Sequence, residues 1–291
     1  MDVFVKLWGM PSATPGEFQG TPLLSSGAAP YAGGTRGVRS RPGGSRLRRI
    51  IACTLAVMAA TFLLLAGLWL VLRPGMQQEV DMIPAHVHSL LRAAHAPYTP
   101  LSHVSPNMRY ALVAIEDRRF YQHHGIDLHA IARSVVDDLV HRRLGEGGAT
   151  LTVQLVERTI PLSANPLIRA LKTLALAWVV EDSFSKARIL ELYLNDVYYG
   201  RGAYGIAAAS RVYFARTPDS LTLAQSAFLA ALPQAPSVYG AAPYALAAQA
   251  RWRTVLSNMR QQGYITGAQE VRALHQGLSM VTSHRQKLAA G

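Results

Sequence analysis

The feature that most constrains this chain is an uninterrupted apolar run near its N-terminus, from Ile50 to Leu72. The run contains no charged residue, no proline and a single glycine, Gly67. About 20 such residues suffice to cross the hydrocarbon core of a bilayer as a helix, whereas a buried helix of this length without a polar face is unusual in a soluble domain. A secretory signal peptide fits less well, because the run is longer than an h-region and begins far from the N-terminus. We therefore expect residues 50–72 to form one transmembrane helix.

The charges that flank this run predict its orientation. The far side carries Arg73 and then two acidic residues, Glu79 and Asp81. The near side carries a cluster of arginines: Arg36, Arg39, Arg41, Arg46, Arg48 and Arg49. Positive charge is retained in the cytoplasm, so we expect a single-pass protein with its N-terminus inside. In a bacterium this places the C-terminal domain on the periplasmic side of the inner membrane.

The rest of the chain divides by composition. Residues 1–49 are rich in Gly, Pro, Ser and Ala, which is typical of a disordered, here basic and cytoplasmic, tail. Residues 73–96 indicate a connector of loose helical character, residues 97–270 the main domain, and residues 271–291 a C-terminal tail.

Apolar residues recur at helical spacing through the main domain, and no convincing alternating strand pattern is present. Ser185 is a suitable N-cap for one of the predicted helices. The predicted helical segments are residues 107–115, 126–144, 150–160, 166–181, 186–194, 221–232 and 245–262. We therefore expect a mainly α domain.

The formal net charge of +12 indicates an anionic partner. A phospholipid surface, a nucleic acid and a phosphorylated substrate all satisfy this condition, and charge alone does not choose among them. A nucleic-acid binder explains only the charge, because the chain has no nucleic-acid motif and its domain would be exported. We therefore expect no nucleic-acid partner.

Three stretches carry residues suited to chemistry. The first is EDRRFYQHHGID, residues 116–127, with two adjacent carboxylates followed by a pair of histidines and a glycine. Taken alone, the acidic pair could simply face solvent beside Arg118 and Arg119, since most carboxylates are surface groups. Adjacent histidines point in different directions, so a structural histidine is expected rather than a metal site.

The second stretch is GEGGATLTVQ, residues 145–154, in which glycines precede a helix. The free N–H groups of a first helical turn bind anions such as pyrophosphate, although glycine before a helix is usually only a turn. In the third stretch Arg169 and Lys172 share a helix face. An apolar stripe that follows, Leu190, Tyr193 and Leu194, is typical of a core.

Taken together and in order, the motifs EDRRFYQHHGID, GGATLTVQ, SKARILELYLNDVYYG and RGAYGIAAASRVYF resemble the successive signatures of glycosyltransferase family 51. The later stretch LTLAQSAFLAALPQAPSVYG, followed by VLSNMRQQGYIT, is similar to the C-terminal part of that domain. The resemblance covers roughly residues 97–266. No transpeptidase domain follows, so the chain resembles the monofunctional biosynthetic peptidoglycan transglycosylases.

The resemblance implies a lysozyme-like fold with a small membrane-proximal lobe. It also implies an activity: transfer of a growing glycan from undecaprenyl pyrophosphate onto the 4-hydroxyl of a lipid II sugar, with inversion. The partners would be lipid II, nascent glycan strands and the bilayer, and other cell-wall synthesis proteins remain open. No cofactor is assigned, and a divalent cation such as Mg²⁺ remains open.

The resemblance assigns Glu116 as the general base, and its apolar neighbours Ala114 and Ile115 favour a raised pKa for its carboxyl. The resemblance also places residues from three motifs in substrate binding, and Lys172 is added because it shares the helix face of Arg169. These substrate-binding candidates are Asp117, Phe120, His123, Gly125, Thr150, Gln154, Arg169 and Lys172.

The chain departs from the family pattern at four positions: Val153 replaces a glutamine, Glu157 and Ala170 replace lysines, and Thr173 replaces a second catalytic-site glutamate. Glu157 would place a negative charge next to a pyrophosphate, with Arg158 or Lys172 as candidates to compensate. Two hypotheses follow. The chain is a peptidoglycan glycosyltransferase with an altered second site, or a catalytically impaired relative that binds lipid II or glycan as a cell-wall assembly scaffold.

Overall fold

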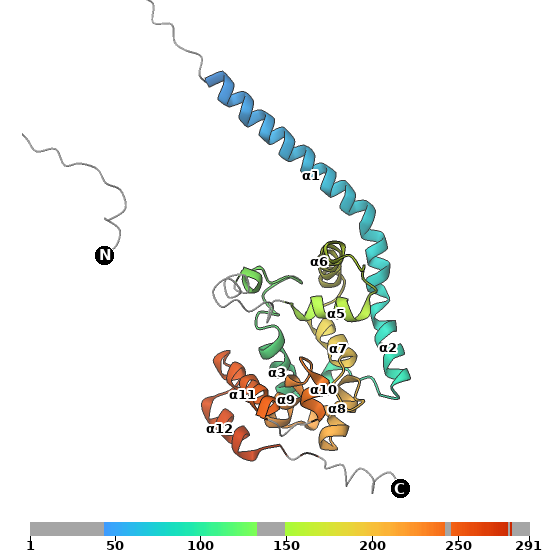
Figure 1. The fold of residues 1–291 in the computed structure, drawn as a ribbon, viewed down its shortest axis with the longest axis vertical. Helices are drawn as coiled ribbons and strands as arrows, with labels where there is room; N and C mark the ends of the chain where they lie inside the picture. Colours follow the sequence, from blue (N-terminus) through green and yellow to red (C-terminus); the bar gives the residue numbers. More distant parts are fainter. Residues whose placement is uncertain (1–43, 133–148, 242–245, 279, 281–291) are drawn as a thin grey trace, which may run out of the picture. The chain divides into compact units, whose positions relative to one another are not determined.

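The computed structural model describes residues 44–132, 149–241, 246–278 and 280 (Figure 1). By its internal contacts the chain divides into two units, Met1–Met58 and Ala59–Gly291. The first unit contributes only the beginning of helix α1 to the described residues. The second contains the remainder of α1 and every other described element.

Helix α1 (Gly44–Asp81) contains the apolar run and extends beyond it at both ends, with Pro74 inside the helix. The described residues include one helix long and apolar enough to cross a membrane, and its most apolar window has a mean hydropathy of 2.5 with none of its residues buried. Most side chains of this run are therefore exposed within the described residues, and Trp69 near its end is the one that packs against the hydrophobic core.

Helix α2 (Ile83–Ala93) lies within residues 73–96, for which the sequence predicts a connector of loose helical character. Val80 at the end of α1 and three residues of α2, Ile83, Val87 and Leu91, are almost completely buried in the main hydrophobic core. Their spacing of three or four residues places them on one face of the helical path, so this segment is a packed part of the domain.

The other described α-helices follow in chain order: α3 (Pro106–Glu116), α5 (Leu151–Thr159), α6 (Pro166–Ser183), α7 (Lys186–Asp196), α8 (Gly205–Phe214), α9 (Leu223–Ala231), α10 (Pro236–Ala241), α11 (Leu246–Gln261) and α12 (Gly267–Gln276). Five of them, α3, α5, α7, α9 and α11, fall on predicted segments, as does most of α6. The predicted helix at residues 126–144 lies mostly outside the described residues. Helices α8, α10 and α12 have no counterpart among the predicted segments.

Side chains at the predicted boundaries explain where several helices begin. Ser185 caps α7 by accepting from the N–H of Arg188 at 3.2 Å, as the sequence predicts. Asn165 caps α6 ahead of Pro166, and Thr222 begins α9 with a reciprocal capping box. These oxygens satisfy backbone donors that have no intrahelical partner.

The helices pack in two neighbouring groups that meet near the C-terminal end of α3. Helix α3 packs against α9 and α11, which also pack against each other, and α5 packs against α6 and α7 (Figure 1). Among the described residues only two isolated β-bridges occur and no strand. The predicted mainly α fold class is confirmed.

We expect Leu91→Ala to lower the free energy of unfolding by about 2–5 kcal/mol, because it removes a fully buried side chain from the core. Ser89→Ala, at an exposed position of the same helix, is the matched control and should change stability by less than about 0.5 kcal/mol. Thermal unfolding of the full chain in detergent measures both. Equal stability of the two variants would show that α2 is only a connector.

Candidate functional site

The site is built around Glu116, the last residue of α3. The end of this helix is held by α11 and the residue after it, because Asn258 Nδ2 and Gln262 Nε2 donate to the carbonyl of Ala114 at 3.4 and 2.9 Å. Gln154 of α5 donates from Nε2 to Glu116 Oε2 at 3.0 Å. The other carboxylate oxygen, Oε1, is buried and has no hydrogen-bond partner among the described residues. One oxygen of Glu116 is therefore fixed and the other is free to accept.

Burial raises the pKa of Glu116 above its ordinary value of 4.5. The hydrogen bond from Gln154 and the positive charges of Arg251 and Arg158 act in the opposite direction, and Asp117 adds a smaller upward contribution. A carboxyl with a raised pKa is a stronger proton acceptor once ionised, which suits a general base. The sequence-based expectation of a raised pKa agrees with this direction.

Asp117 connects the first motif to the second. Its carboxylate accepts from His123 Nε2 at 2.9 and 3.0 Å and from the backbone N–H of Leu151, at the start of α5, at 3.0 Å. Both partners are buried, and a carboxylate at a helix N-terminus is electrostatically favourable. His123 is therefore a positioning partner of Asp117, in line with the structural histidine that the sequence favours.

The turn after this pair is closed by Thr150. Its Oγ1 donates to the carbonyl of Gly125 at 2.6 Å and accepts from the N–H of Val153 at 3.1 Å. Gly125 has a φ of +78°, and a Cβ at this position would lie 2.8 Å from the carbonyl oxygen of Ala177 in α6. Only glycine suits both the conformation and the contact. Phe120 is fully buried below this turn, with Lys186 Nζ 4.5 Å from its ring centroid.

Two residues that the sequence did not assign to the site of Glu116 complete its surroundings: Tyr193, expected only in an apolar stripe, and Arg158, named only as a candidate to compensate for Glu157. Tyr193 of α7 is fully buried, as its place in the apolar stripe predicts, but its hydroxyl donates to Gln154 Oε1 at 2.8 Å. The guanidinium of Arg158 lies 5.6 Å from the Tyr193 ring centroid and acts electrostatically on Glu116 and on Asp196. Burial raises the pKa of Asp196, while Arg158 lowers it.

Within the described residues, the two basic residues expected on α6 form no hydrogen bond or ion pair with Glu116 or its partners. Arg169 is exposed and donates from Nε to the carbonyl of Ser163 at 3.1 Å. Lys172 forms an ion pair with Glu79 of α1, with Nζ and Oε2 2.8 Å apart. Of the two candidates to compensate for Glu157, Arg158 acts on the site directly and Lys172 is engaged elsewhere.

The structure also locates three positions at which the chain departs from the family pattern. Glu157 and Ala170 are exposed, and Thr173 is buried with no hydrogen-bond partner for its Oγ1 among the described residues. Glu181 does not substitute for the missing glutamate. It accepts from Thr152 and forms a 2.8 Å ion pair with Lys186 instead. The altered position therefore holds a small, buried hydroxyl without a carboxylate.

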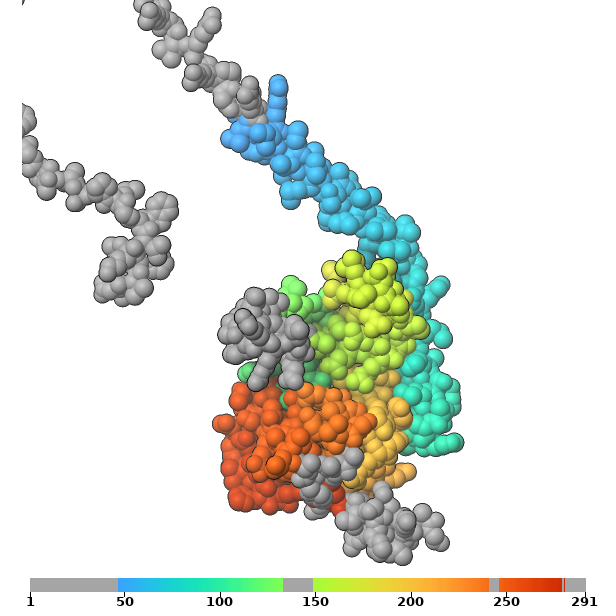
Figure 2. Space-filling view, viewed as in Figure 1, coloured from blue at the N-terminus to red at the C-terminus, as the bar shows by residue number. Residues whose placement is uncertain are grey.

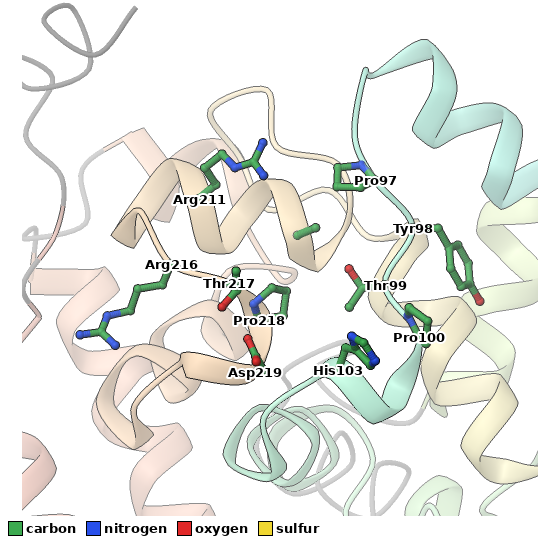
Figure 3. Close-up of a pocket in the computed structure, with 11 residues that line it drawn as sticks. Pro97, Tyr98, Thr99, Pro100, His103, Arg211, Arg216, Thr217, Pro218 and Asp219 are labelled. Atoms are coloured by element: carbon green, nitrogen blue, oxygen red, sulfur yellow. The ribbon is translucent and has the colours of Figure 1, made fainter.

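A separate cavity of about 290 Å³ is lined by residues 97–103, by α8 and by residues 216–219. In Figure 3 the side chain of Arg216 extends away from Thr99. None of the predicted site residues lines it. Within the described residues no group of three or more His, Cys, Asp or Glu side chains could hold a metal ion, so no ligand set can be given there for the cation that the sequence leaves open.

The family model described as "Transglycosylase" matches residues 85–260 of this chain. The match includes most of α2 and most of α11, and it covers every motif of the first subsection except the end of VLSNMRQQGYIT, residues 261–266. It begins inside the segment that the sequence suggests as a connector, at the helix whose residues are buried in the core.

Similar proteins include penicillin-binding protein 1F of Bacillus subtilis, 37% identical over 194 residues, which are 67% of this chain and 27% of that protein. Penicillin-binding protein 1A of Neisseria lactamica is 38% identical over 206 residues, 71% of this chain and 26% of its own length. The chain thus spans about a quarter of the length of these relatives. A crystal structure of penicillin-binding protein 1A from Haemophilus influenzae is 38% identical, covers 35% of this chain and 15% of that one, and has a TM-score of 0.32.

We expect Gly125→Ala to destabilise the protein by about 1–3 kcal/mol more than Gly202→Ala. Both glycines have a positive φ, but a Cβ at Gly202 meets nothing within 4 Å, so the difference isolates the approach of the first-motif turn to α6. Thermal unfolding in detergent compares the two variants. Equal losses would contradict the close packing of this turn.

Proposed function

The chain belongs to the transglycosylase family, and on this basis we propose that it is a peptidoglycan glycosyltransferase that polymerises lipid II, with Glu116 as its general base. The observation that carries the proposal is the state of the Glu116 carboxyl. Gln154 occupies Oε2, whereas Oε1 is buried, has no hydrogen-bond partner in the part of the chain that the structure describes, and can accept a hydroxyl proton.

In the proposed reaction the 4-hydroxyl of a lipid II sugar attacks the anomeric carbon of the growing strand, and undecaprenyl pyrophosphate leaves. Glu116 takes the proton from the attacking hydroxyl. Burial keeps its carboxyl poorly solvated, which strengthens its action on a hydroxyl held at hydrogen-bond distance. Asp117 and His123 would act indirectly, because they fix the turn on which Glu116 is presented.

The leaving pyrophosphate requires positive groups. Arg158 is the best-placed cation on α5, because its charge already reaches Glu116 and Asp196. We propose that it replaces the lysine that is Glu157 in this chain. Arg169 remains a candidate for the same role from α6, while Lys172 would first have to leave Glu79.

A second candidate function is a catalytically impaired relative that binds lipid II or glycan and acts as a scaffold. The observation in its favour is Thr173, which supplies no charge where the family resemblance places a second glutamate. Such a protein would keep the substrate cleft and lose turnover.

We further propose that α1 anchors the domain in the bacterial inner membrane, with residues 1–49 in the cytoplasm and the domain in the periplasm. Next to α1 the helix α6 exposes several apolar side chains, and its surface is visible in yellow-green in Figure 2. The rings of Trp69 and Trp178 lie 6.0 Å apart, and Arg73 of α1 pairs with Asp182 of α6. The exposed apolar side chains of α6 are Leu167, Ile168, Leu171, Leu174 and Trp178. This face suits the membrane-proximal lobe from which a lipid-linked substrate would enter.

We expect Glu116→Gln to lower the rate of lipid II polymerisation by at least about 100-fold, because an amide cannot accept the hydroxyl proton. The full-length protein in detergent is given labelled lipid II, and the glycan formed is separated by gel electrophoresis. Glu270→Gln on α12 is the control: the amide oxygen can still accept from Arg260, the ion-pair partner of Glu270, and the rate should stay within about twofold.

The same assay separates the two candidate functions. Glycan made by the wild type and lost in Glu116→Gln supports the enzyme. A silent wild type together with a Thr173→Glu variant that makes glycan would establish the impaired relative. Equal glycan synthesis by wild type and Glu116→Gln would exclude Glu116 as the base.

For the membrane orientation, alkaline phosphatase fused after Gly291 should be active in a bacterium, because this enzyme needs the oxidising periplasm for its disulfides. The same fusion lacking residues 44–72 should be inactive. An inactive full-length fusion that is stably produced would place the C-terminus in the cytoplasm and contradict the positive-inside prediction.

A further inference from the structure

Three side chains from three helices form a hydrogen-bonded series that ends at the proposed base. The hydroxyl of Tyr193 donates to Gln154 Oε1 at 2.8 Å, and Gln154 Nε2 donates to Glu116 Oε2 at 3.0 Å. Both distances are those of well-formed hydrogen bonds. The series joins α7 through α5 to α3, three elements whose other contacts already fix their backbones.

When Glu116 is ionised, the chemistry of the three groups allows only one orientation of the Gln154 side-chain amide. A carboxylate has only acceptors, so the edge of the Gln154 amide that faces it must be the NH₂ group. The carbonyl edge then faces Tyr193, whose hydroxyl can donate to it. Burial raises the pKa of Tyr193 well above its ordinary value of 10, so the hydroxyl keeps the proton that it donates.

We propose, on the premise of the function above, that Tyr193 is a positioning residue: it fixes the orientation of the Gln154 amide, so that Glu116 Oε2 receives an N–H and Oε1 remains the only oxygen free for the acceptor hydroxyl. In the part of the chain that the structure describes, the Tyr193 hydroxyl bonds to Gln154 and forms no hydrogen bond with Glu116. It acts through Gln154.

The alternative orientation of the amide explains why a positioning residue is needed. Rotation of the amide by half a turn would direct Gln154 Oε1 at Glu116, where it repels a carboxylate and accepts a hydrogen bond from a protonated carboxyl. The flipped state would therefore hold Glu116 in the form that cannot act as a base. In the flipped state the Tyr193 hydroxyl could accept from the Gln154 NH₂ group, but its own proton would lose the only acceptor that it has among the described residues. Leaving this buried donor unsatisfied disfavours the flipped state.

The charged and titratable groups around Glu116 come from several elements. Arg158 lies on α5, Arg251 on α11 and Asp117 next to Glu116 in the chain, and all three act on its carboxyl. Tyr199, after α7, also lies within electrostatic reach of Glu116. Among the described residues none of these four forms a hydrogen bond with Glu116, so removal of the Tyr193 hydroxyl changes the hydrogen bonding of the carboxyl and leaves these charges in place.

The test is a direct titration of Glu116 in the full-length protein in detergent, with ¹³C NMR of labelled glutamate side chains. The resonance of Glu116 is assigned from its absence in Glu116→Gln. We expect Tyr193→Phe to raise the pKa of Glu116 by about one unit, because loss of the fixed N–H donor disfavours the ionised form. Gln154→Leu should give a shift of similar size.

A double-mutant cycle then separates positioning from an independent effect. If Tyr193 acts through Gln154, the double variant should titrate like Gln154→Leu alone. The matched control is Tyr199→Phe, because Tyr199 is an equally buried tyrosine whose hydroxyl has no hydrogen-bond partner among the described residues. Its loss should shift the pKa of Glu116 by less than about 0.3 unit, which is small beside the effect of a hydrogen bond to a charged group.

A second measurement needs no variant at the tyrosine. In the wild type the side-chain NH₂ resonances of Gln154, assigned from their loss in Gln154→Leu, should titrate with the pKa of Glu116, because the amide nitrogen faces the carboxyl.

The proposal is overturned if these resonances do not titrate, if Tyr193→Phe shifts the pKa of Glu116 no more than Tyr199→Phe does, or if the shifts of Tyr193→Phe and Gln154→Leu simply add. None of these readouts uses turnover. A protein that shows the shifts but makes no glycan would refute the proposed function and leave the positioning role in place.

Discussion

The carboxylate of Asp117 is the interaction on which the rest of the site depends. It holds His123 and the first N–H of α5 at the same time, so the end of α3, the turn after it and the start of α5 are fixed to one another. A buried carboxylate with two strong donors is a specific, directional constraint. Because α5 begins where Asp117 holds it, Gln154 one turn later meets Glu116.

This arrangement gives the two adjacent carboxylates different environments. Asp117 accepts from two donors, and both of its oxygens are engaged. Glu116 receives one donor from a side chain, and its other oxygen is buried without a partner among the described residues. A carboxylate with donors on both oxygens is suited to a structural role, whereas one with an unengaged, poorly solvated oxygen is suited to accept a proton. Environment, and not residue type, distinguishes the two.

Many helices of the domain could be predicted because capping residues and apolar spacing within each segment determine them. Helix α7 follows from the cap at Ser185 and the stripe of buried residues behind it, and the helical character of α3 and α5 from their apolar spacing. Helix α2 could not be predicted as part of the core, because nothing in its own residues identifies the distant helix faces that bury Val87 and Leu91.

Side-chain contacts between residues far apart in the sequence could not be predicted either. The stripe containing Tyr193 was correctly predicted as core, but its hydroxyl partner Gln154 lies 39 positions away in the chain. The ion pair that engages Lys172 is formed with Glu79 on a different helix, so a basic residue on the expected face turns out to be neutralised. Position in a motif identifies a candidate residue, whereas its charge environment depends on elements that the motif does not contain.

The central claim is that Glu116 works as a base at a site where Thr173 stands in place of a second glutamate. The most direct measurement is the pH dependence of kcat/KM for lipid II polymerisation by the wild-type protein, because this ratio reports the ionisation of the free enzyme. The raised pKa of Glu116 predicts that kcat/KM is low in acid and rises as pH increases through a value above 4.5, since only the ionised carboxyl accepts the proton. A kcat/KM that does not change through this range would contradict the account.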